Sequence, residues 1–218
     1  MLSKVFKSQA RGLNRWFSTS KVVTLEYSDL TSPKAELHDQ IAEAYGPDGY
    51  GLLLVKNIPT YTELRTRLLL LNYDLAHLPE AKLKKLVKPE YHYGVGFSRG
   101  VEKFKGKPDF SKGSFYANPQ LDETIYNPQN PSEVLVPGNV WPKEDLPEYE
   151  YAFKDLGRLV VGVGERVAGV VDKYVEKALP GFEKGKIQRI IRESKTCKAR
   201  GLLYYPSKRY YVSLRLIV

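Results

Sequence analysis

The side chains best suited to metal binding and acid–base chemistry are few in this sequence of 218 residues. It has three histidines, His38, His77 and His92, and none of them is followed two positions later by Asp or Glu. We therefore predict that these histidines are ordinary surface or half-buried residues.

The other reactive side chains give weak signals. Cys197 is the single cysteine, which excludes an internal disulfide and a cysteine-rich zinc site. With no histidine nearby in the sequence, Cys197 is predicted to be an inert, half-buried thiol rather than a nucleophile. Arg99 and Lys107 could point at a substrate, although charges in loops are usually solvated.

Hydrophobic periodicity predicts helices and strands in the first 90 residues. The expected strands are residues 22–27 and 51–55, and the second is expected to be buried. A first helix is expected to open with Ser32 as N-cap and Pro33 at the first helical position, and to end at Gly46. The apolar residues that mark this helix and the two that follow it are Leu37, Ile41 and Ala44, then Leu64, Leu68, Leu71 and Leu75, then Leu83 and Leu86.

Residues 91–147 contain six glycines and seven prolines and keep no regular period. We predict a long loop region that covers a site, and its many aromatic side chains favour packing over disorder. From Pro147 onward, apolar residues at spacings of three and four predict one long helix as far as Pro180. Its four glycines suggest close packing of another element, since each costs about 1 kcal/mol relative to alanine. Gly162 and Gly164 are not a dinucleotide loop, because no strand precedes them. A short helix at residues 187–191 and a strand at residues 199–205 are expected after it.

Four stretches carry a resemblance to a known family. Residues 96–119, GFSRGVEKFKGKPDFSKGSFYANP, resemble a segment of isopenicillin N synthase-like oxygenases that reads G-[WF]-S-x-G-x-E-x-x-x-G-K-P-D-x-x-K-G-S-[FY]-Y-A-N-P. Residues 139–142, 146–154 and 198–206 match further stretches in the same order. The resemblance covers about residues 22–206 and implies an α+β fold, in which a helical N-terminal region precedes a double-stranded β-helix, or jelly roll. One long helix supports that barrel, and residues 153–178 are the candidate.

The resemblance also implies a chemistry that this sequence does not complete. Family members oxidise a small-molecule substrate with O₂ while decarboxylating 2-oxoglutarate at an iron(II) held by two histidines and a carboxylate. In those proteins a His-x-Asp pair and a later histidine follow the Tyr-Pro strand, and an Arg-x-Ser pair then binds the oxoacid. Here no such residues follow Pro206. We therefore assign no catalytic and no metal-binding residue, and whether the chain is an enzyme stays open.

One cosubstrate contact is carried over from the resemblance. Family members often have Asn-x-Tyr-Pro on this strand, where the asparagine and the tyrosine approach 2-oxoglutarate. Tyr205 matches that tyrosine and is our candidate for binding 2-oxoglutarate, but Leu203 stands in place of the asparagine. The alternative interpretation of Tyr205 is a plain core aromatic.

Two functional classes follow. The first is the N-terminal part of an Fe(II)/2-oxoglutarate-dependent oxygenase, expected to be catalytically incomplete, because a jelly roll needs about eight strands and the sequence predicts far fewer. Fe(II) and 2-oxoglutarate are expected for a full-length member, but this chain is expected to bind neither. The second class is a non-catalytic accessory or scaffold protein of the mitochondrion. In either class a protein partner is expected to cover apolar surface that the missing barrel leaves exposed.

The net charge of +9 is concentrated at the two ends of the chain. The first 21 residues carry five cationic side chains with no acid, and the basic tail at residues 207–218, which matches nothing in the family, carries three more. Residues 22–206 are therefore nearly neutral, which argues against nucleic-acid binding.

Residues 1–17 form the pattern of an organelle-import presequence. Apolar residues recur at helical spacing, and basic residues form a second stripe along the same helix. The segment also contains serines and no acids. Arg15 and Phe17 resemble the Arg-x-Phe-Ser site where mitochondrial presequences are cut, so the mature chain is expected to begin at Ser18. The alternatives are a plastid transit peptide or an attached surface helix on a cytoplasmic protein. No stretch reaches the roughly 20 apolar residues needed to span a membrane.

Overall fold

The computed structural model describes residues 22–32 and 34–206. The predicted presequence 1–17, the expected cut before Ser18 and the basic tail 207–218 lie outside the described residues. The described chain divides into two compact units. The first contains the chain up to Ile58 together with Val170–Lys184, and the second contains Pro59–Gly169 and the chain from Gly185 onward.

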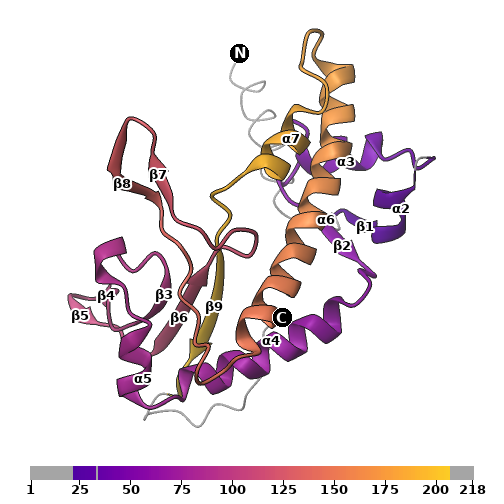
Figure 1. Cartoon of the computed structure of the whole chain (residues 1–218). Coiled ribbons are helices and arrows are strands. Elements are labelled where there is room, and N and C mark those ends of the chain that lie inside the picture. The colour runs from indigo at the N-terminus through magenta and orange to yellow at the C-terminus, as the bar shows by residue number, and fades with distance from the viewer. Residues whose placement is uncertain (1–21, 33, 207–218) are drawn as a thin grey trace, which may run out of the picture. The chain divides into compact units, whose positions relative to one another are not determined.

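The first unit has a small parallel sheet and two short helices (Figure 1). Its elements are β1 (Thr24–Glu26), α2 (Tyr27–Thr31), α3 (His38–Tyr45), β2 (Leu54–Lys56) and the end of α6 (Tyr149–Ala178). Leu25, Leu37 and Ile41 are buried, and they pack with Val170 and Tyr174 of α6. The expected first strand and the inward positions of Leu37 and Ile41 are confirmed.

Two expectations for this unit are wrong. Ser32 does not open the first long helix: it follows the end of α2, and its backbone N–H donates to the carbonyl of Asp29 at 3.3 Å. The helix begins at His38, and Leu37, the residue directly before it, is buried in the core. The expected buried strand at residues 51–55 is instead a three-residue strand that starts at Leu54, whose side chain is exposed.

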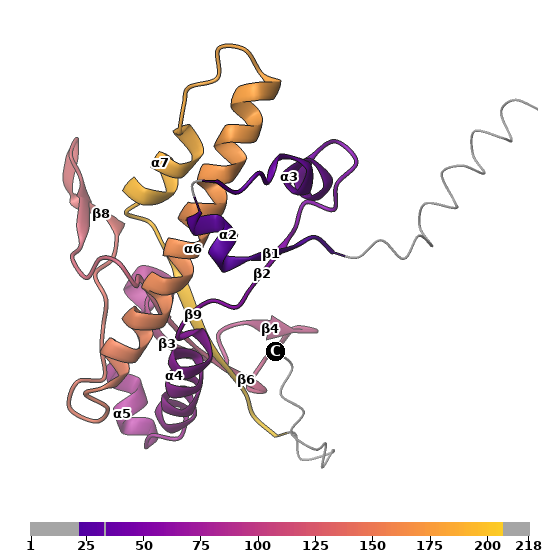
Figure 2. The same cartoon turned by 90° about the vertical axis from the view of Figure 1, so that its right-hand side faces the viewer.

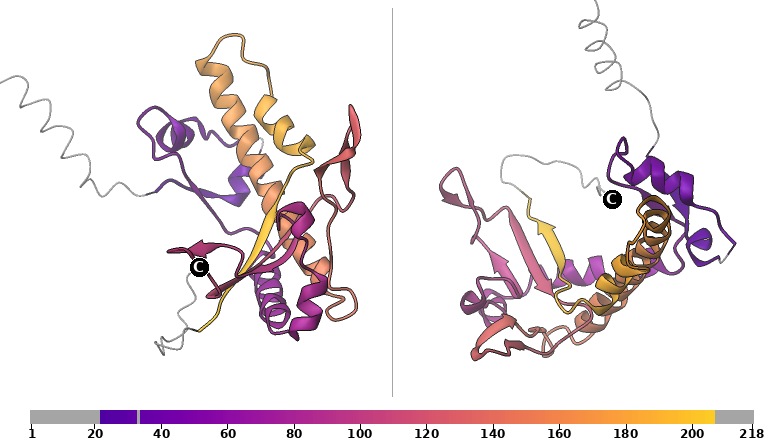
Figure 3. Two further views of the ribbon diagram at one scale, coloured as in Figure 1. Left: turned by 90° about the vertical axis from the view of Figure 1, so that its left-hand side faces the viewer. Right: turned by 90° about the horizontal axis from the view of Figure 1, so that it is seen from above.

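The second unit is built around a three-stranded antiparallel sheet in the order β3-β6-β9, with α4 packed beside β9 (Figures 2 and 3). Its helices are α4 (Tyr61–Ala76), α5 (Glu80–Lys85), the 3-10 helix η2 (Pro89–Tyr91), the first part of α6, and α7 (Lys186–Glu193). Its strands are β3 (Gly96–Arg99), β4 (Lys103–Phe104), β5 (Lys107–Pro108), β6 (Lys112–Ala117), β7 (Ile125–Asn127), β8 (Asn130–Val136) and β9 (Ala199–Tyr204).

The expected loop region at residues 91–147 is wrong as a description of secondary structure. It contains six of the strands, which form β3 and β6 of the sheet and the two hairpins β4–β5 and β7–β8. No alternation marks the central strand β6, because Gly113, Ser114 and Phe115 are all buried. A strand that is covered on both faces loses the period of two by which strands are recognised.

The long helix is confirmed, and so are α4, α5, α7 and the strand β9. Close packing at the glycines of α6 is confirmed at two positions. A Cβ atom on Gly157 would lie 2.3 Å from Pro119, and one on Gly169 would lie 3.1 Å from the side chain of Gln188. No atom of the described residues lies within 4 Å of a Cβ placed on Gly162 or Gly164, so packing does not explain those two.

An aromatic cluster forms the centre of the second unit. Phe115 of β6 lies with its ring centroid 4.9 Å from Tyr149 and 5.9 Å from Phe153, both on α6, and 5.8 Å from Trp141. The hydroxyl of Tyr149 donates to the Oδ1 atom of Asn72 on α4 at 2.6 Å. The cluster therefore joins the sheet to both helices, which positions one face of the sheet.

The mixed helix and strand fold is confirmed. The strands of the described residues form four small sheets and no closed barrel. None of the helices in this part of the chain combines the length and the apolarity needed to cross a membrane.

Candidate functional site

The sheet β3-β6-β9 has one apolar face and one polar face. Phe97 and Phe115 are cross-strand neighbours on the face toward the aromatic cluster. The opposite face presents Ser98, Ser114 and Arg200, because side chains alternate along each strand. On the polar face the side chain of Arg200 covers the buried Ser114, so the sheet's own side chains bury its central strand there.

Arg200 is the best-fixed cation on the polar face. Its Nε and Nη2 atoms donate to the Oγ atom of Ser114 at 3.1 and 2.7 Å, and Nη2 lies 3.4 Å from Glu102. Its guanidinium carbon lies 5.2 Å from the ring centroid of Tyr116. Glu102 also pairs with Lys112, and this hydrogen bond lowers the pKa of the Glu102 carboxyl below its usual value. Glu102 is thus an anion shared by two cations.

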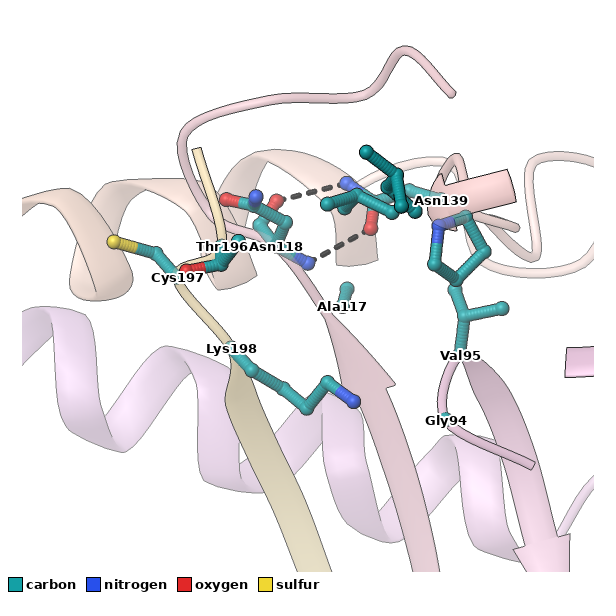
Figure 4. Close-up of a pocket in the computed structure, with 11 residues that line it drawn as sticks. Gly94, Val95, Ala117, Asn118, Asn139, Thr196, Cys197 and Lys198 are labelled. Carbon is teal, nitrogen blue, oxygen red and sulfur yellow. Dashed lines mark hydrogen bonds between the residues drawn. The ribbon is translucent and has the colours of Figure 1, made fainter. Parts of the chain in front are cut away.

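A cavity of about 170 Å³ lies at the end of this sheet (Figure 4). Val95, Ala117, Leu135 and Val136 give it an apolar wall. Lys198 lies at its edge, and Figure 4 shows the lysine side chain reaching from its strand toward Gly94. The sulfur of the half-buried Cys197 points away from the other labelled residues of the cavity.

Two asparagines from the family-like motifs hold this region together. The backbone N–H of Asn118 donates to Oδ1 of Asn139 at 2.8 Å, and Nδ2 of Asn139 donates back to the Asn118 carbonyl at 2.8 Å. The side chain of Asn118 bonds to the backbone of Gln120, Leu121 and Lys195. Every nitrogen and oxygen atom of these two side-chain amides therefore has a hydrogen-bond partner within the protein. These bonds explain why asparagine stands at these motif positions, without a ligand.

Asp122 is the charged side chain at the centre of the same hydrogen-bonded region. Its Oδ1 atom accepts hydrogen bonds from Nδ2 of Asn139 and Nε1 of Trp141, and Lys154 pairs with its Oδ2 atom. Burial alone would raise the pKa of Asp122, but the bonds from Lys154, Asn139 and Trp141 together bring it below its ordinary value. The folded state therefore favours the ionised carboxylate.

Replacing Asp122 with asparagine is expected to destabilise the chain at neutral pH. The cost should be about 1 kcal/mol, below the usual range for charged hydrogen bonds, because solvent screens a half-exposed carboxylate. A lowered pKa stabilises the fold above the unfolded-state pKa, and that contribution is lost as the pH falls through the folded value. The difference in unfolding midpoint between the two proteins should therefore shrink in acid. A difference that stays constant down to the acid limit would show that the charge is not involved.

The structure brings together two residues that the sequence singled out separately, Arg99 and Tyr205. The guanidinium carbon of Arg99 lies 3.6 Å from the centroid of the Tyr205 ring, and Arg99 also donates to the Phe110 carbonyl. The Tyr205 hydroxyl donates to the carbonyl of Ala76 at 2.9 Å. Burial raises the pKa of Tyr205, and the Arg99 charge opposes this. That contact with Ala76 at the end of α4 gives Tyr205 a structural role, and a contact with 2-oxoglutarate stays a prediction. Lys107, the other loop cation, is exposed on β5.

The three histidines lie in separate environments and do not come together as iron ligands. Nδ1 of His77 lies 2.7 Å from the Tyr73 carbonyl, so Nδ1 carries the proton, and the ring stacks on Tyr73. His92 is exposed after η2, and His38, in the first unit, lies 4.9 Å from the ring of Tyr174. Within the described part of the chain, no three His, Cys, Asp or Glu side chains group closely enough to hold a metal ion.

An Arg-x-Ser spacing does occur once, at Arg192 and Ser194, but ahead of the Tyr-Pro strand. Nε of Arg192 there donates to Glu165 of α6 at 2.8 Å. This pair therefore stands at the wrong place in the chain order for binding the oxoacid, and its cation already has an acidic partner.

Comparison with known proteins places the fold. No family profile matches the sequence, and no curated protein matches it. Among solved structures, a Caulobacter crescentus protein assigned to the 2OG-Fe(II) oxygenase family is similar with a TM-score of 0.53 and 18% identity. The described chain therefore shares its fold with about half of this oxygenase-family protein. The resemblance drawn from the motifs is thus confirmed at the level of the fold.

The similarity covers 72% of this chain and 50% of the Caulobacter oxygenase-family protein, so this chain spans about half of that length. Two further solved structures are similar. JOX2 in complex with 2OG, Fe and JA is 17% identical, with a TM-score of 0.48 over 78% of this chain and 44% of that one. A full-length Neurospora crassa protein in complex with alpha-KG is 17% identical, with a TM-score of 0.47 over 69% of this chain and 46% of that one.

The sequence analysis did not single out the residues of the polar face. Ser114 and Arg200 lie inside the motifs that carry the resemblance to the oxygenases, yet neither was predicted to act with the other. One signal was present: Lys198 and Arg200 are two residues apart at the start of a predicted strand. That spacing puts both cations on the same face of a sheet.

Proposed function

We propose that residues 22–206 form the N-terminal, barrel-supporting region of an Fe(II)/2-oxoglutarate-dependent oxygenase-like protein, and that this chain does not assemble the iron centre by itself. The observation that carries this proposal is the sheet β3-β6-β9, apolar against the aromatic cluster and polar on the other face, in a fold similar to half of an oxygenase-family protein. The polar face is where the reaction chamber would be completed.

Under this proposal, iron and 2-oxoglutarate in the completed protein would activate O₂ for the oxidation of a small-molecule substrate, and the described residues would support and shape the chamber. The polar face contributes cations and hydroxyls. Asp122 accepts a hydrogen bond from Asn139, which in turn bonds to Asn118 at the end of β6, and these bonds fix that end of the sheet. Exposed apolar side chains such as Val160 and Tyr204 would be covered by barrel strands or by a protein partner.

Two measurements test the proposal. The full chain, mixed with Fe(II) and 2-oxoglutarate and exposed to O₂, is expected to release no succinate above a protein-free control, because its described residues bring no three iron ligands together. The transcript beyond the Pro206 codon is expected to encode His-x-Asp and Arg-x-Ser, and the extended chain should then produce succinate.

The opposite results have clear meanings. A transcript without those codons would favour the accessory or scaffold protein over the oxygenase. A stoichiometric ferrous ion bound through His38, His77 or His92 would contradict the proposal directly, since it would require a metal site of a different kind.

We further propose import into mitochondria, on the basis of the basic amphipathic segment at residues 1–17. N-terminal sequencing of the protein isolated from the organelle should give Ser18 as the first residue. Recovery from plastids, or of an uncut cytoplasmic protein, would reject mitochondrial import.

A further inference from the structure

We propose that the cavity at the end of the sheet, with Lys198 in its lining and Arg200 over the same Tyr116 ring as Lys198, binds a small carboxylic acid with a short apolar body. The carboxylate would lie against the two cations, and the body would fill the cavity. This inference rests on the proposed function only in taking that acid as the substrate class of the oxygenase-like protein.

The cavity itself selects an apolar body. Val95, Leu135, Val136 and Pro137 line it. The side-chain amides of Asn118 and Asn139 also line it, but they already form hydrogen bonds with the backbone and with Asp122. A polar ligand group would find no free partner among these amides and would lose its bonds to water. At about 170 Å³ the cavity is smaller than the usual range for drug-sized ligands, about 300–1,000 Å³, so the body must be short.

Charge selects the other end of the ligand. The ammonium of Lys198 has no hydrogen-bond acceptor among the described residues, and its one close partner is the ring of Tyr116, with a centroid 5.9 Å away. Nη1 of Arg200 is also without an acceptor in this part of the chain, since its bonds run from Nε and Nη2. Glu102 is the anion paired with Arg200, and it is shared with Lys112. Positive charge is therefore in excess, and an anion would offset it.

Of the two cations, Arg200 is held in place by hydrogen bonds. Arg200 pairs with Tyr116 across the sheet, and the Lys198 ammonium lies 5.9 Å from the centroid of the same ring. Ser114 fixes the guanidinium with two hydrogen bonds, so little rotational freedom is left to lose when a ligand binds. A carboxylate suits such donors because charge-assisted hydrogen bonds to it are short and strong.

The backbone at the rim supports the assignment. His92 and Tyr93 both adopt left-handed conformations, with φ of 51° and 58°, directly before Gly94 of the cavity wall. Two consecutive non-glycine residues in this region are strained, and such strain is concentrated at binding sites. A Cβ atom on Gly94 would lie 3.2 Å from the Lys198 ammonium, so the glycine leaves room for the lysine.

Isothermal titration of the full chain with butyrate and with its neutral isostere butyramide tests the proposal. Butyrate is expected to bind saturably in the millimolar range, and butyramide about tenfold more weakly or worse, because it lacks the charge-assisted bonds. Lys198→Met should weaken butyrate binding about tenfold, and Lys198→Arg should restore most of it. Lys107→Met, which removes an exposed cation from β5, is the matched control and should leave binding unchanged.

A second variant tests the apolar wall without disturbing the core. Leu135 is 51% exposed yet lines the cavity, so Leu135→Ser should preserve folding and weaken butyrate more than acetate. Equal binding of butyrate and butyramide, or full binding by Lys198→Met, would overturn the proposal. So would the absence of saturation by butyrate.

The titration is independent of iron. Butyrate binding by a chain whose transcript encodes no iron ligands would keep the carboxylate site and reject the proposed function. Succinate release by an extended chain that does not bind butyrate would support the proposed function and reject the carboxylate site.

Discussion

Replacing Phe115 with alanine is expected to lower the free energy of unfolding by about 3–5 kcal/mol, the usual cost of deleting a buried phenylalanine. Phe115 is 1% exposed, and its ring contacts Tyr149, Phe153 and Trp141. The substitution removes apolar burial and leaves a cavity that these large, rigid rings can fill only in part. Urea unfolding of the full chain, followed at one fixed protein concentration, measures the loss.

Phe104 provides the control, since its side chain is 68% exposed on β4. Phe104→Ala makes the same chemical change at the surface and should alter stability by no more than about 0.5 kcal/mol. Similar losses for both variants would mean that the aromatic cluster does not hold the sheet against α6.

Replacing Gly96 with alanine is expected to cost about 3 kcal/mol or more, through backbone strain and a broken hydrogen bond. Gly96 has φ of +73°, and a Cβ atom there would lie 2.0 Å from the carbonyl oxygen of Leu86. That carbonyl accepts a hydrogen bond from the backbone N–H of Phe97 at 2.9 Å. Because both atoms in the clash are fixed by the backbone, β3 must shift away from the end of α5. Thermal unfolding of the full chain should show a large drop in midpoint.

Gly106 separates the two causes of that loss. Its φ is +77°, nearly the same as that of Gly96, but no atom of the described residues lies within 4 Å of an added Cβ. Gly106→Ala should therefore cost only the left-handed conformation, about 1–2 kcal/mol. Equal costs at the two positions would show that Leu86 moves aside freely.

The helices could be predicted from sequence because their apolar spacing is strong enough to outweigh local preferences. In α6 the run of apolar residues at helical spacing persists through four glycines, each unfavourable by about 1 kcal/mol. Local signals alone were less reliable. Ser32 is a good capping residue, yet the burial of Leu37 sets where α3 begins, and this depends on contacts distant in sequence.

The strands of residues 91–147 could not be predicted because they are short and lack alternation. β4 and β5 have two residues each, too few for any period, and β6 is buried on both faces. The candidate site was hidden for the same reason. Pairing of Arg200 with Tyr116 depends on the register between β6 and β9, which no local pattern encodes. Arg99 and Tyr205 were both noted in the sequence, but their contact follows from the fold alone.

The central strand of the sheet has a consequence for biosynthesis. β6 pairs on one side with β3, which precedes it closely, and on the other with β9, so that Ser114 and Arg200, in contact across the sheet, are 86 residues apart. A ribosome must therefore release nearly all of the described chain before that second edge can be closed. Until then the edge is open to pairing with other nascent chains, and a chaperone that shields it in this interval would raise the yield of folded protein.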